Sequence, residues 1–390
     1  MQRTDLSFAI TILSAANFVI GMGAFMVVGM LNPVAADLGL SPARAGWMMT
    51  IYALCYAVLS PVLVAVTGRV GRRRILAFGL LLFAAANAAA SLVSGEAGLL
   101  AARGLAAAGA GLVTPVTAAV AANMAVPERQ ARALASVFFG LTLAQVLGVP
   151  VGSWVAYTFG WRWAFAIVAL LAFPIAALIW TRIPAGMSVP PVTLSDLTRT
   201  LSNVRYLLTI SFTAVFIGSI YVVYTYLAPL LSTHMNFGRD GIASVLLIFG
   251  AGAVIGNLAG GQLTDRIGAT RTLLILTSSQ AALLPWFSGL PLPLPGLTGL
   301  ILLWSTSGWA FMAAQQVRLI ALDPGNVSVL LALNAAAIYI GSAFGAFVGG
   351  FVIDAQGLDV LGWVASAGAI AAALVLVLAN QLNRRATDKA

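Results

Sequence analysis

Charged side chains are scarce in this sequence. Only 8% of its residues are Asp, Glu, Lys or Arg, whereas hydrophobic residues make up 61%. A soluble domain averages about 25% charged and about 45–50% apolar residues. A chain of this composition cannot keep a folded surface in contact with water, so its surface must face lipid. The sequence therefore predicts a protein that crosses the membrane several times.

Cysteine and histidine are almost absent, with Cys55 and His234 as the single examples. One cysteine excludes an internal disulfide, and a histidine without a cysteine or carboxylate cluster argues against a metal site. The chain has no Gly-x-x-x-x-Gly-Lys-Ser/Thr segment, which argues against nucleotide hydrolysis as an energy source. No acidic pair or Ser–His arrangement falls inside an apolar stretch. We therefore expect no metal, no cofactor and no enzymatic activity.

Long apolar stretches are what the sequence has instead. A membrane helix needs about 20 consecutive, mostly apolar residues. Twelve stretches of this kind cover residues 8–30, 46–66, 75–94, 99–122, 134–157, 163–182, 206–230, 242–264, 272–290, 298–321, 328–352 and 361–382. Six fall in each half. We predict an all-α integral membrane protein with twelve transmembrane helices in two pseudo-symmetric six-helix bundles. The bundles span residues 1–182 and 206–390, with a cytoplasmic linker at 183–205.

The basic residues give the orientation. If the N-terminus is cytoplasmic, fifteen of them fall in inner segments, and only Arg44, Arg162 and Arg239 fall in outer ones. Cytoplasmic loops carry such an excess of Lys and Arg, so both termini are predicted to be cytoplasmic. This distribution accounts for the net charge of +9 without a nucleic-acid partner.

One motif occurs twice, 197 residues apart. Gly-Arg-Val-Gly-Arg-Arg-Arg at 68–74 returns as Asp-Arg-Ile-Gly-Ala-Thr-Arg at 265–271. The same offset relates three pairs of glycines, which are Gly148 and Gly345, Gly152 and Gly349, and Gly160 and Gly357. Two similar halves are typical of secondary transporters, whose substrate site lies where the halves meet.

This repeated motif resembles the major facilitator superfamily, and within it the twelve-helix drug:proton antiporter and sugar-efflux-like branch. The family pattern is Gly-x-Leu-Ala-Asp-Arg-x-Gly-Arg-Arg. Its second copy here is carried by Gly261, Leu263, Asp265, Arg266 and Gly268, and its first by Arg69, Gly71, Arg72 and Arg73. The first copy has Gly68 at the aspartate position. An Asp–Arg pair in a tight turn can hold a helix end against a neighbour, so we predict a gate latch. The alternative is that the arginines only set topology.

A seam of small residues follows in the fifth stretch, where Gly148, Pro150 and Gly152 resemble the antiporter-branch motif Gly-x-x-x-Gly-Pro-x-x-Gly-Gly. The eleventh stretch has its counterpart in Gly341, Gly345 and Gly349. Small residues four apart let membrane helices approach closely, and an interior proline permits a bend. Tight packing is one interpretation of this helix seam, and a surface on which the halves rock is the other.

Arg103 is the most costly residue of the chain, since a charge at a helix centre costs ~2.5–3.5 kcal/mol on insertion scales. It resembles the arginine of the family pattern Arg-x-x-Gln-Gly-x-Gly, which implies a role in proton handling; an interface anchor is the alternative. The family's branch has a glutamate in its first helix where this chain has Ala24, and no Asp or Glu lies in the middle of a stretch. Proton coupling is therefore expected to use Arg103 or the peripheral Asp354; without it, the protein would be a facilitator.

Polar and aromatic residues at mid-helix depth are the candidates for a substrate cavity. They are Asn17, Tyr52, Tyr56, Gln145, Tyr221, Tyr224, Trp304, Gln315, Asn334 and Tyr339. Each is explained equally well as a contact between helices. Together they describe aromatic walls with neutral amides, which suit an uncharged or lipophilic solute.

The resemblance implies proton-driven efflux of a small organic solute across a bacterial inner membrane by a monomeric carrier. Its expected partners are the solute, protons and the lipid bilayer. An uncoupled facilitator or importer of a neutral metabolite, such as a sugar or nucleoside, is the alternative.

Overall fold

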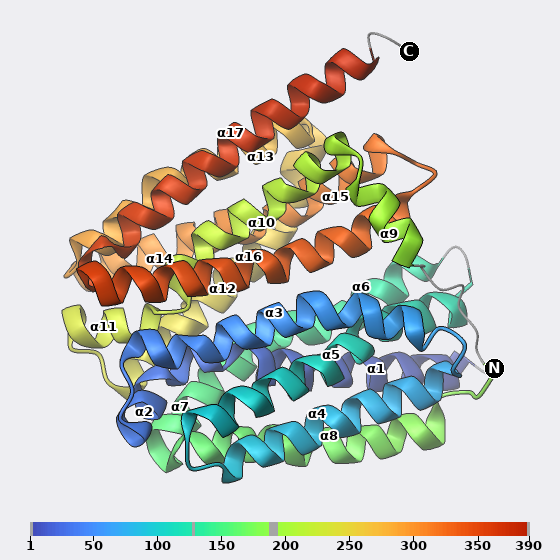
Figure 1. Ribbon diagram of the computed structural model, residues 1–390, viewed down its shortest axis with the longest axis horizontal. Coiled ribbons are helices and arrows are strands. Elements are labelled where there is room, and N and C mark those ends of the chain that lie inside the picture. Colours follow the sequence, from blue (N-terminus) through green and yellow to red (C-terminus); the bar gives the residue numbers. More distant parts are fainter. Residues whose placement is uncertain (1–2, 127–128, 187–193, 388–390) are drawn as a thin grey trace. The chain divides into compact units, whose positions relative to one another are not determined.

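The chain folds into helices that form two compact units (Figure 1). The computed structural model describes residues 3–126, 129–186 and 194–387. The first unit comprises the described parts of residues 1–40 and 51–191, and the second those of 41–50 and 192–390. The segment 41–50, which the sequence places in the first half, thus packs with the second. Of the predicted linker 183–205, residues 187–193 lie outside the described residues.

The first unit consists of the helices between Arg3 and Arg182, apart from the segment 41–50. Its elements are α1 (Arg3–Phe25), α2 (Val27–Leu38), the later part of α3 (Pro42–Val66), α4 (Arg72–Leu92), α5 (Glu96–Met124), α6 (Gln130–Leu143), the π-helical turn η2 (Ala144–Gly148), α7 (Val149–Phe159) and α8 (Trp161–Arg182). Helix α4 packs against both α5 and α8, and α1 packs against α6. Where α4 meets α5, a Cβ on Gly109 would lie 2.7 Å from the backbone nitrogen of Phe83. Van der Waals packing at such close approaches holds membrane helices together.

The second unit is arranged around α10 and α16. Its elements are α9 (Leu194–Leu201), α10 (Val204–Tyr224), α11 (Leu227–Met235), α12 (Arg239–Ile267), α13 (Ala269–Leu283), the 3₁₀ turn η3 (Leu284–Gly289), α14 (Leu294–Trp309), α15 (Phe311–Leu322), α16 (Val327–Gln356), η4 (Leu358–Val360) and α17 (Leu361–Thr387). Helix α10 packs against α16 and α17, while α12 packs against α14. The first nine residues of α3 belong to this unit.

Eleven segments among the described residues are long and apolar enough to span a membrane. The remaining predicted span, 272–290, corresponds to α13 followed by η3, so no single helix there is long enough. The predicted span 134–157 is made of α6, η2 and α7. The prediction of an all-α, twelve-span membrane fold is confirmed.

The repeat of 197 residues is visible in the element boundaries. Three pairs of helices begin at positions separated by this offset, which are Pro42 of α3 and Arg239 of α12, Arg72 of α4 and Ala269 of α13, and Gln130 of α6 and Val327 of α16. Backbone angles follow it in part. Gly160 and Gly357 both have a positive φ, of 98° and 87°, at the start of a new element. Gly268 has a φ of 84°, whereas its partner Gly71 has −56°.

The first long helix of each half is interrupted. Helix α1 ends at Phe25, and α2 starts after Met26. Helix α10 ends at Tyr224, and α11 starts at Leu227, within a few residues of the position that the offset gives. Interrupted helices are tolerated in membranes where other groups satisfy the freed backbone atoms.

Candidate functional site

Arg103 lies against the interruption between α1 and α2. Its Nη1 donates to the carbonyl oxygen of Gly23 at 2.7 Å, and Nη2 donates to that of Ala24 at 3.2 Å. Carbonyl groups at the end of a helix lack their usual partners. The guanidinium carbon lies 4.3 Å from the centre of the Tyr52 ring, and only 1% of the side chain is exposed. The arginine therefore bridges α5 to the broken helix.

This geometry ties α5 to the end of α1. Ala24 occupies the position where the resembled branch has a glutamate, and its backbone carbonyl now receives the guanidinium. Two carbonyls and an aromatic face can hold the charge without a carboxylate. A role of Arg103 in proton handling stays a prediction.

The first half of the predicted helix seam packs on the same interruption. A Cβ on Gly148 would lie 3.1 Å from Met22 Cβ, and one on Gly152 would lie 2.8 Å from Met26 Cβ. Pro150 is the second residue of α7, separated by one residue from the π turn η2, where its missing N–H group is tolerated. This half of the seam thus lies inside the first unit. Its part in a rocking movement stays a prediction.

The second half of the seam packs on the interruption between α10 and α11. A Cβ on Gly345 would lie 2.9 Å from Tyr221 Cβ, and one on Gly349 would lie 2.7 Å from the ring of Tyr226. Gly341 faces the backbone of α10. The Tyr226 hydroxyl donates to the Ala346 carbonyl at 2.7 Å. A phenol therefore braces the broken helix of this unit, as a guanidinium does in the other.

Three of the predicted cavity residues meet in an aromatic cluster of the second unit. Tyr224 stacks on Phe249 with ring centres 4.4 Å apart, and Trp304 contacts Phe249 at 5.1 Å and Phe287 at 4.7 Å. Tyr221 adjoins Tyr224 at 5.4 Å. The Trp304 side chain is fully buried, and its Nε1 has no hydrogen-bond partner among the described residues. Orphan donors of this kind are rare in folded proteins and need an explanation.

Gln280 is a member of this cluster that the sequence analysis missed. Its Nε2 donates to the Trp304 carbonyl at 2.9 Å and to Ser307 Oγ at 2.8 Å. Its Oε1 has no partner among the described residues. In the sequence, Gln280 stands out only as an amide side chain within the apolar stretch 272–290.

Gln315 and Asn334 belong to a separate polar network of the second unit. Gln315 Nε2 donates to the Thr209 carbonyl at 2.9 Å, and Thr213 Oγ1 donates to Asn334 Oδ1 at 2.6 Å. Arg318, also missed, is only 8% exposed and donates to Asn380 Oδ1 at 2.9 Å. Tyr339, on α16, is half-buried.

The first unit holds the remaining cavity candidates. Asn17 is buried in α1 and donates to Thr117 Oγ1 at 2.8 Å. Tyr52 and Tyr56 stack with ring centres 6.4 Å apart beside Arg103. Gln145 is half-buried in η2. The ten candidates thus fall into several groups, and the structure brings only some of them into contact.

The arginine loop before α4 contains both exposed and buried side chains. Arg69 is exposed and Arg72 is buried, while the Arg73 guanidinium lies 5.1 Å from the centre of the Trp180 ring. Gly71 and Arg73, with Arg74 and residues 185–186, line a cavity of about 200 Å³.

The second copy of this motif lies at the end of α12. Gly261 is on the helix, with open space beside it, and Gly268 ends the helix. Asp265 and Arg266 are both exposed. The gate latch stays a prediction.

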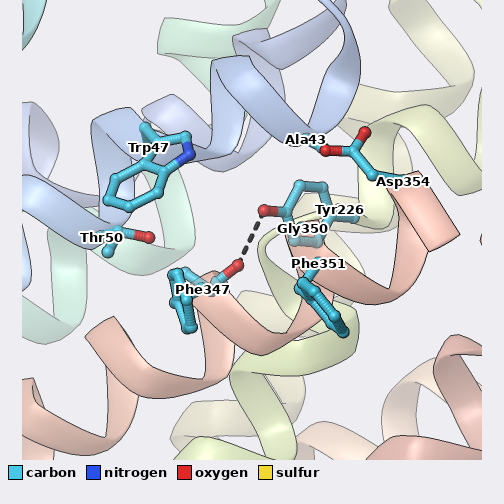
Figure 2. Close-up of a pocket in the computed structure, with 9 residues that line it drawn as sticks. Ala43, Trp47, Thr50, Tyr226, Phe347, Gly350, Phe351 and Asp354 are labelled. Atoms are coloured by element: carbon cyan, nitrogen blue, oxygen red, sulfur yellow. Dashed lines mark hydrogen bonds between the residues drawn. The ribbon is translucent and has the colours of Figure 1, made fainter.

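Asp354, near the end of α16, is exposed and borders a cavity of about 120 Å³ in the second unit (Figure 2). The cavity is lined by Ala43, Trp47, Thr50, Tyr226, Ala346, Phe347, Gly350, Phe351 and Asp354. Figure 2 shows the Asp354 carboxylate and the Trp47 indole on opposite sides of the Tyr226 ring.

Buried charge in the described residues is positive. Arg72, Arg103 and Arg318 are buried, whereas no described Asp or Glu side chain is. The interior therefore offers amides, hydroxyls, aromatic rings and guanidinium groups to a solute.

A family model described as Major Facilitator Superfamily matches residues 13–328. The uncharacterized MFS-type transporter YbcL of Bacillus subtilis (strain 168) is 31% identical over 372 residues, which cover 95% of each chain. The inner membrane transport protein YdhP of Escherichia coli (strain K12) is 27% identical over 376 residues, covering 96% of this chain and 95% of that protein.

Solved structures with a similar fold include a bacterial homologue of the human lysosomal transporter Spinster. It has a TM-score of 0.72 at 17% identity, covering 98% of this chain and 97% of that one. The nucleoside transporter NupG has a TM-score of 0.77 at 13% identity, covering 96% of this chain and 99% of that one. At these identities, the similarity concerns the fold alone.

Proposed function

The chain belongs to the Major Facilitator Superfamily, and on that premise we propose that it moves a lipophilic or neutral organic solute by alternating access. Proton-driven efflux through the inner membrane is the proposed mode, as in the drug:proton antiporter and sugar-efflux-like branch. The protein acts as a monomer with both termini in the cytoplasm. The basic inner segments of the sequence support this orientation.

The observation that carries this proposal is the aromatic cluster around Trp304. Its rings and the Gln280 amide are buried, and two polar atoms, Trp304 Nε1 and Gln280 Oε1, have no partner among the described residues. Solute sites are mostly apolar and aromatic, with a few placed polar groups. A neutral solute with one hydrogen-bond acceptor and one donor would satisfy both atoms.

Coupling to protons is proposed to involve Asp354, with Arg103 as the structural anchor beside the interrupted helix. Asp354 is the carboxylate that borders a cavity, and the described carboxylates all lie outside the buried interior. A carboxylate that is reached from solvent can exchange protons without first being moved out of a hydrophobic environment.

A facilitator or importer of a neutral metabolite is the second candidate. Ala24 in place of an acidic residue favours it, as does the lack of a buried carboxylate in the described residues. The similarity in fold to NupG, a nucleoside transporter by name, adds nucleosides to the solutes worth testing.

Transport in proteoliposomes with an imposed pH gradient tests the proposal. The panel contains neutral and cationic amphiphiles, sugars and nucleosides. Solute-dependent proton movement that is lost in Asp354→Asn, and kept in the control Asp359→Asn, would support antiport through Asp354. Solute flux that ignores the gradient would favour the facilitator. Strong transport of an anionic metabolite, with no flux of neutral solutes, would contradict both.

A further inference from the structure

We propose that the cavity beside Asp354 binds the ammonium group of a small organic cation. The proposal concerns a binding site in the second unit, and it holds whichever solute the protein transports. Its basis is a cavity of about 120 Å³ whose walls combine aromatic rings with one carboxylate.

The rings present faces and edges at different angles. The ring centres of Trp47 and Phe347 are 5.6 Å apart, and the two ring planes are inclined at 75°. The two rings therefore form a corner instead of a flat stack. Tyr226 and Phe351 complete the aromatic lining. Aromatic faces attract ammonium groups, and cages of such rings recognise quaternary ammonium ligands.

The carboxylate determines the sign of the ligand charge. Within the described residues, Asp354 forms no hydrogen bond or ion pair, so no side chain of the chain neutralises it there. A neutral ligand in the cavity would remove water from this charge without replacing it, which is unfavourable. A cation compensates the charge, and an anion is repelled.

The cavity is preformed. The Tyr226 hydroxyl is held by its hydrogen bond to the Ala346 carbonyl at 2.7 Å. A Cβ on Gly350 would lie 2.7 Å from that hydroxyl, so only glycine leaves the tyrosine in this position. Ala43 and Ala346 keep the remaining space open. The tyrosine wall is therefore held in place before a ligand binds, which favours binding.

Radiolabelled choline and its neutral isostere 3,3-dimethylbutan-1-ol provide the test. Choline binding is measured on the purified full-length protein in dodecyl maltoside, with the isostere as competitor. We expect choline to bind and the isostere not to displace it at the same concentration. Asp354→Asn should weaken choline binding at least about tenfold, and Phe347→Leu should weaken it less.

The control Asp359→Asn removes an exposed carboxylate from the neighbouring turn η4 and should leave choline binding unchanged. Thermal unfolding of each variant reports whether it is folded, and Asp354 is exposed enough for the asparagine to be tolerated. Equal binding by wild type and Asp354→Asn, or displacement by the neutral isostere, would overturn the proposal. So would a failure of the wild-type protein to bind choline in both detergent and nanodiscs.

The ammonium group can come from a free amine or from a lipid headgroup. Choline binding is therefore repeated in nanodiscs of phosphatidylglycerol alone and of phosphatidylglycerol with phosphatidylethanolamine. Weaker choline binding in the mixed nanodiscs, with no such difference in Asp354→Asn, identifies the headgroup as a ligand. Equal choline binding in both identifies a free amine. Either result supports recognition of an ammonium group, and neither depends on transport.

Discussion

At the residue scale, single side chains hold the irregular parts of the structure together. Arg103 reaches from α5 to two carbonyls of the last turn of α1, and Tyr226 reaches to α16 beside the other interrupted helix. A helix interruption frees backbone groups that lipid cannot satisfy. The first interruption is therefore expected to depend on Arg103, which donates to its freed carbonyls. Tyr226 instead ties the second interruption to α16.

Replacing Arg103 tests this dependence. Arg103→Met removes two charge-assisted hydrogen bonds, and we expect a loss of about 2–3 kcal/mol of stability. Arg103→Lys keeps the charge but cannot span both carbonyls, so it should recover only part of the loss. Thermal unfolding and solute exchange without a pH gradient are the measurements. Unchanged stability and exchange, with only proton movement lost, would assign Arg103 to proton handling instead.

A second prediction concerns the exposed pair Asp37 and Arg162. Hydrogen bonds from the Arg162 guanidinium, at 2.6 Å, and then from the Trp161 indole lower the pKa of the Asp37 carboxyl. Because the folded-state pKa is depressed, the pair stabilises the fold above the unfolded-state pKa of about 3.9. That stability is lost as the pH falls through the folded-state value.

The effect of the Asp37 pair should be small, since the two side chains are 37% and 46% exposed and such pairs contribute less than about 1 kcal/mol. Asp37→Asn should lower the unfolding temperature at pH 6. The difference from wild type should shrink as the pH falls below about 4. A difference that is constant with pH would show that charge is not its cause.

At the element scale, the glycine seams and the helix interruptions belong together. Gly148 and Gly152 lie against Met22 and Met26, and Gly345 and Gly349 lie against Tyr221 and Tyr226. In both units, the small residues make room for the segment where a neighbouring helix is interrupted.

Filling the seam should destabilise the first unit. A Cβ on Gly152 would lie 2.8 Å from Met26 Cβ, so Gly152→Val overpacks the contact and should cost about 1–3 kcal/mol. Gly299→Val is the matched control, because there is open space beside the Cβ that it adds. Thermal unfolding of both variants is the measurement. Equal unfolding temperatures would show that the seam tolerates larger side chains.

The helices could be predicted from the sequence, whereas their interruptions could not. Apolar length alone places the spans, because a bilayer requires about 20 such residues. Nothing in the local pattern around Met26 distinguishes a break from a continuous helix, since Gly23 and Ala24 are common inside membrane helices. Arg103, whose guanidinium contacts the carbonyls at this break, comes from a helix far along the chain.

The same reason limits the prediction of the site. Trp304, Tyr221 and Tyr224 could be selected as aromatic residues at mid-helix depth. Their contacts with Phe249 and Phe287 arise from tertiary packing, which residue type does not encode. Gln280 and Arg318 were visible as polar residues in apolar surroundings, but one sequence does not say which polar residue has partners.

At the scale of the whole molecule, the repeat of 197 residues is kept in the positions where helices start but not in every backbone angle. Helix starts agree at three pairs of positions. The related glycines Gly71 and Gly268 have φ values of −56° and 84°. Only the second value requires glycine.

This difference in φ predicts that a glycine-to-alanine substitution lowers stability in the second copy of the motif but not in the first. Gly268→Ala places a side chain in a region that non-glycine residues avoid, and it should cost about 1–3 kcal/mol. Gly71→Ala requires no such strain and has open space around the added Cβ. Comparison of the two unfolding temperatures is the measurement, and equal losses would contradict the assigned conformations.

The buried guanidinium of Arg103 has a further consequence, which concerns the response of transport to membrane potential. The protein carries this positive charge inside a membrane span, with no described carboxylate buried beside it. A unit charge that crosses the full membrane field changes in energy by about 2.3 kcal/mol per 100 mV. If alternating access shifts Arg103 along the membrane normal, even a neutral solute should be moved at a rate that depends on membrane potential. Flux measured under a potassium diffusion potential, without a pH gradient, would then rise or fall with voltage.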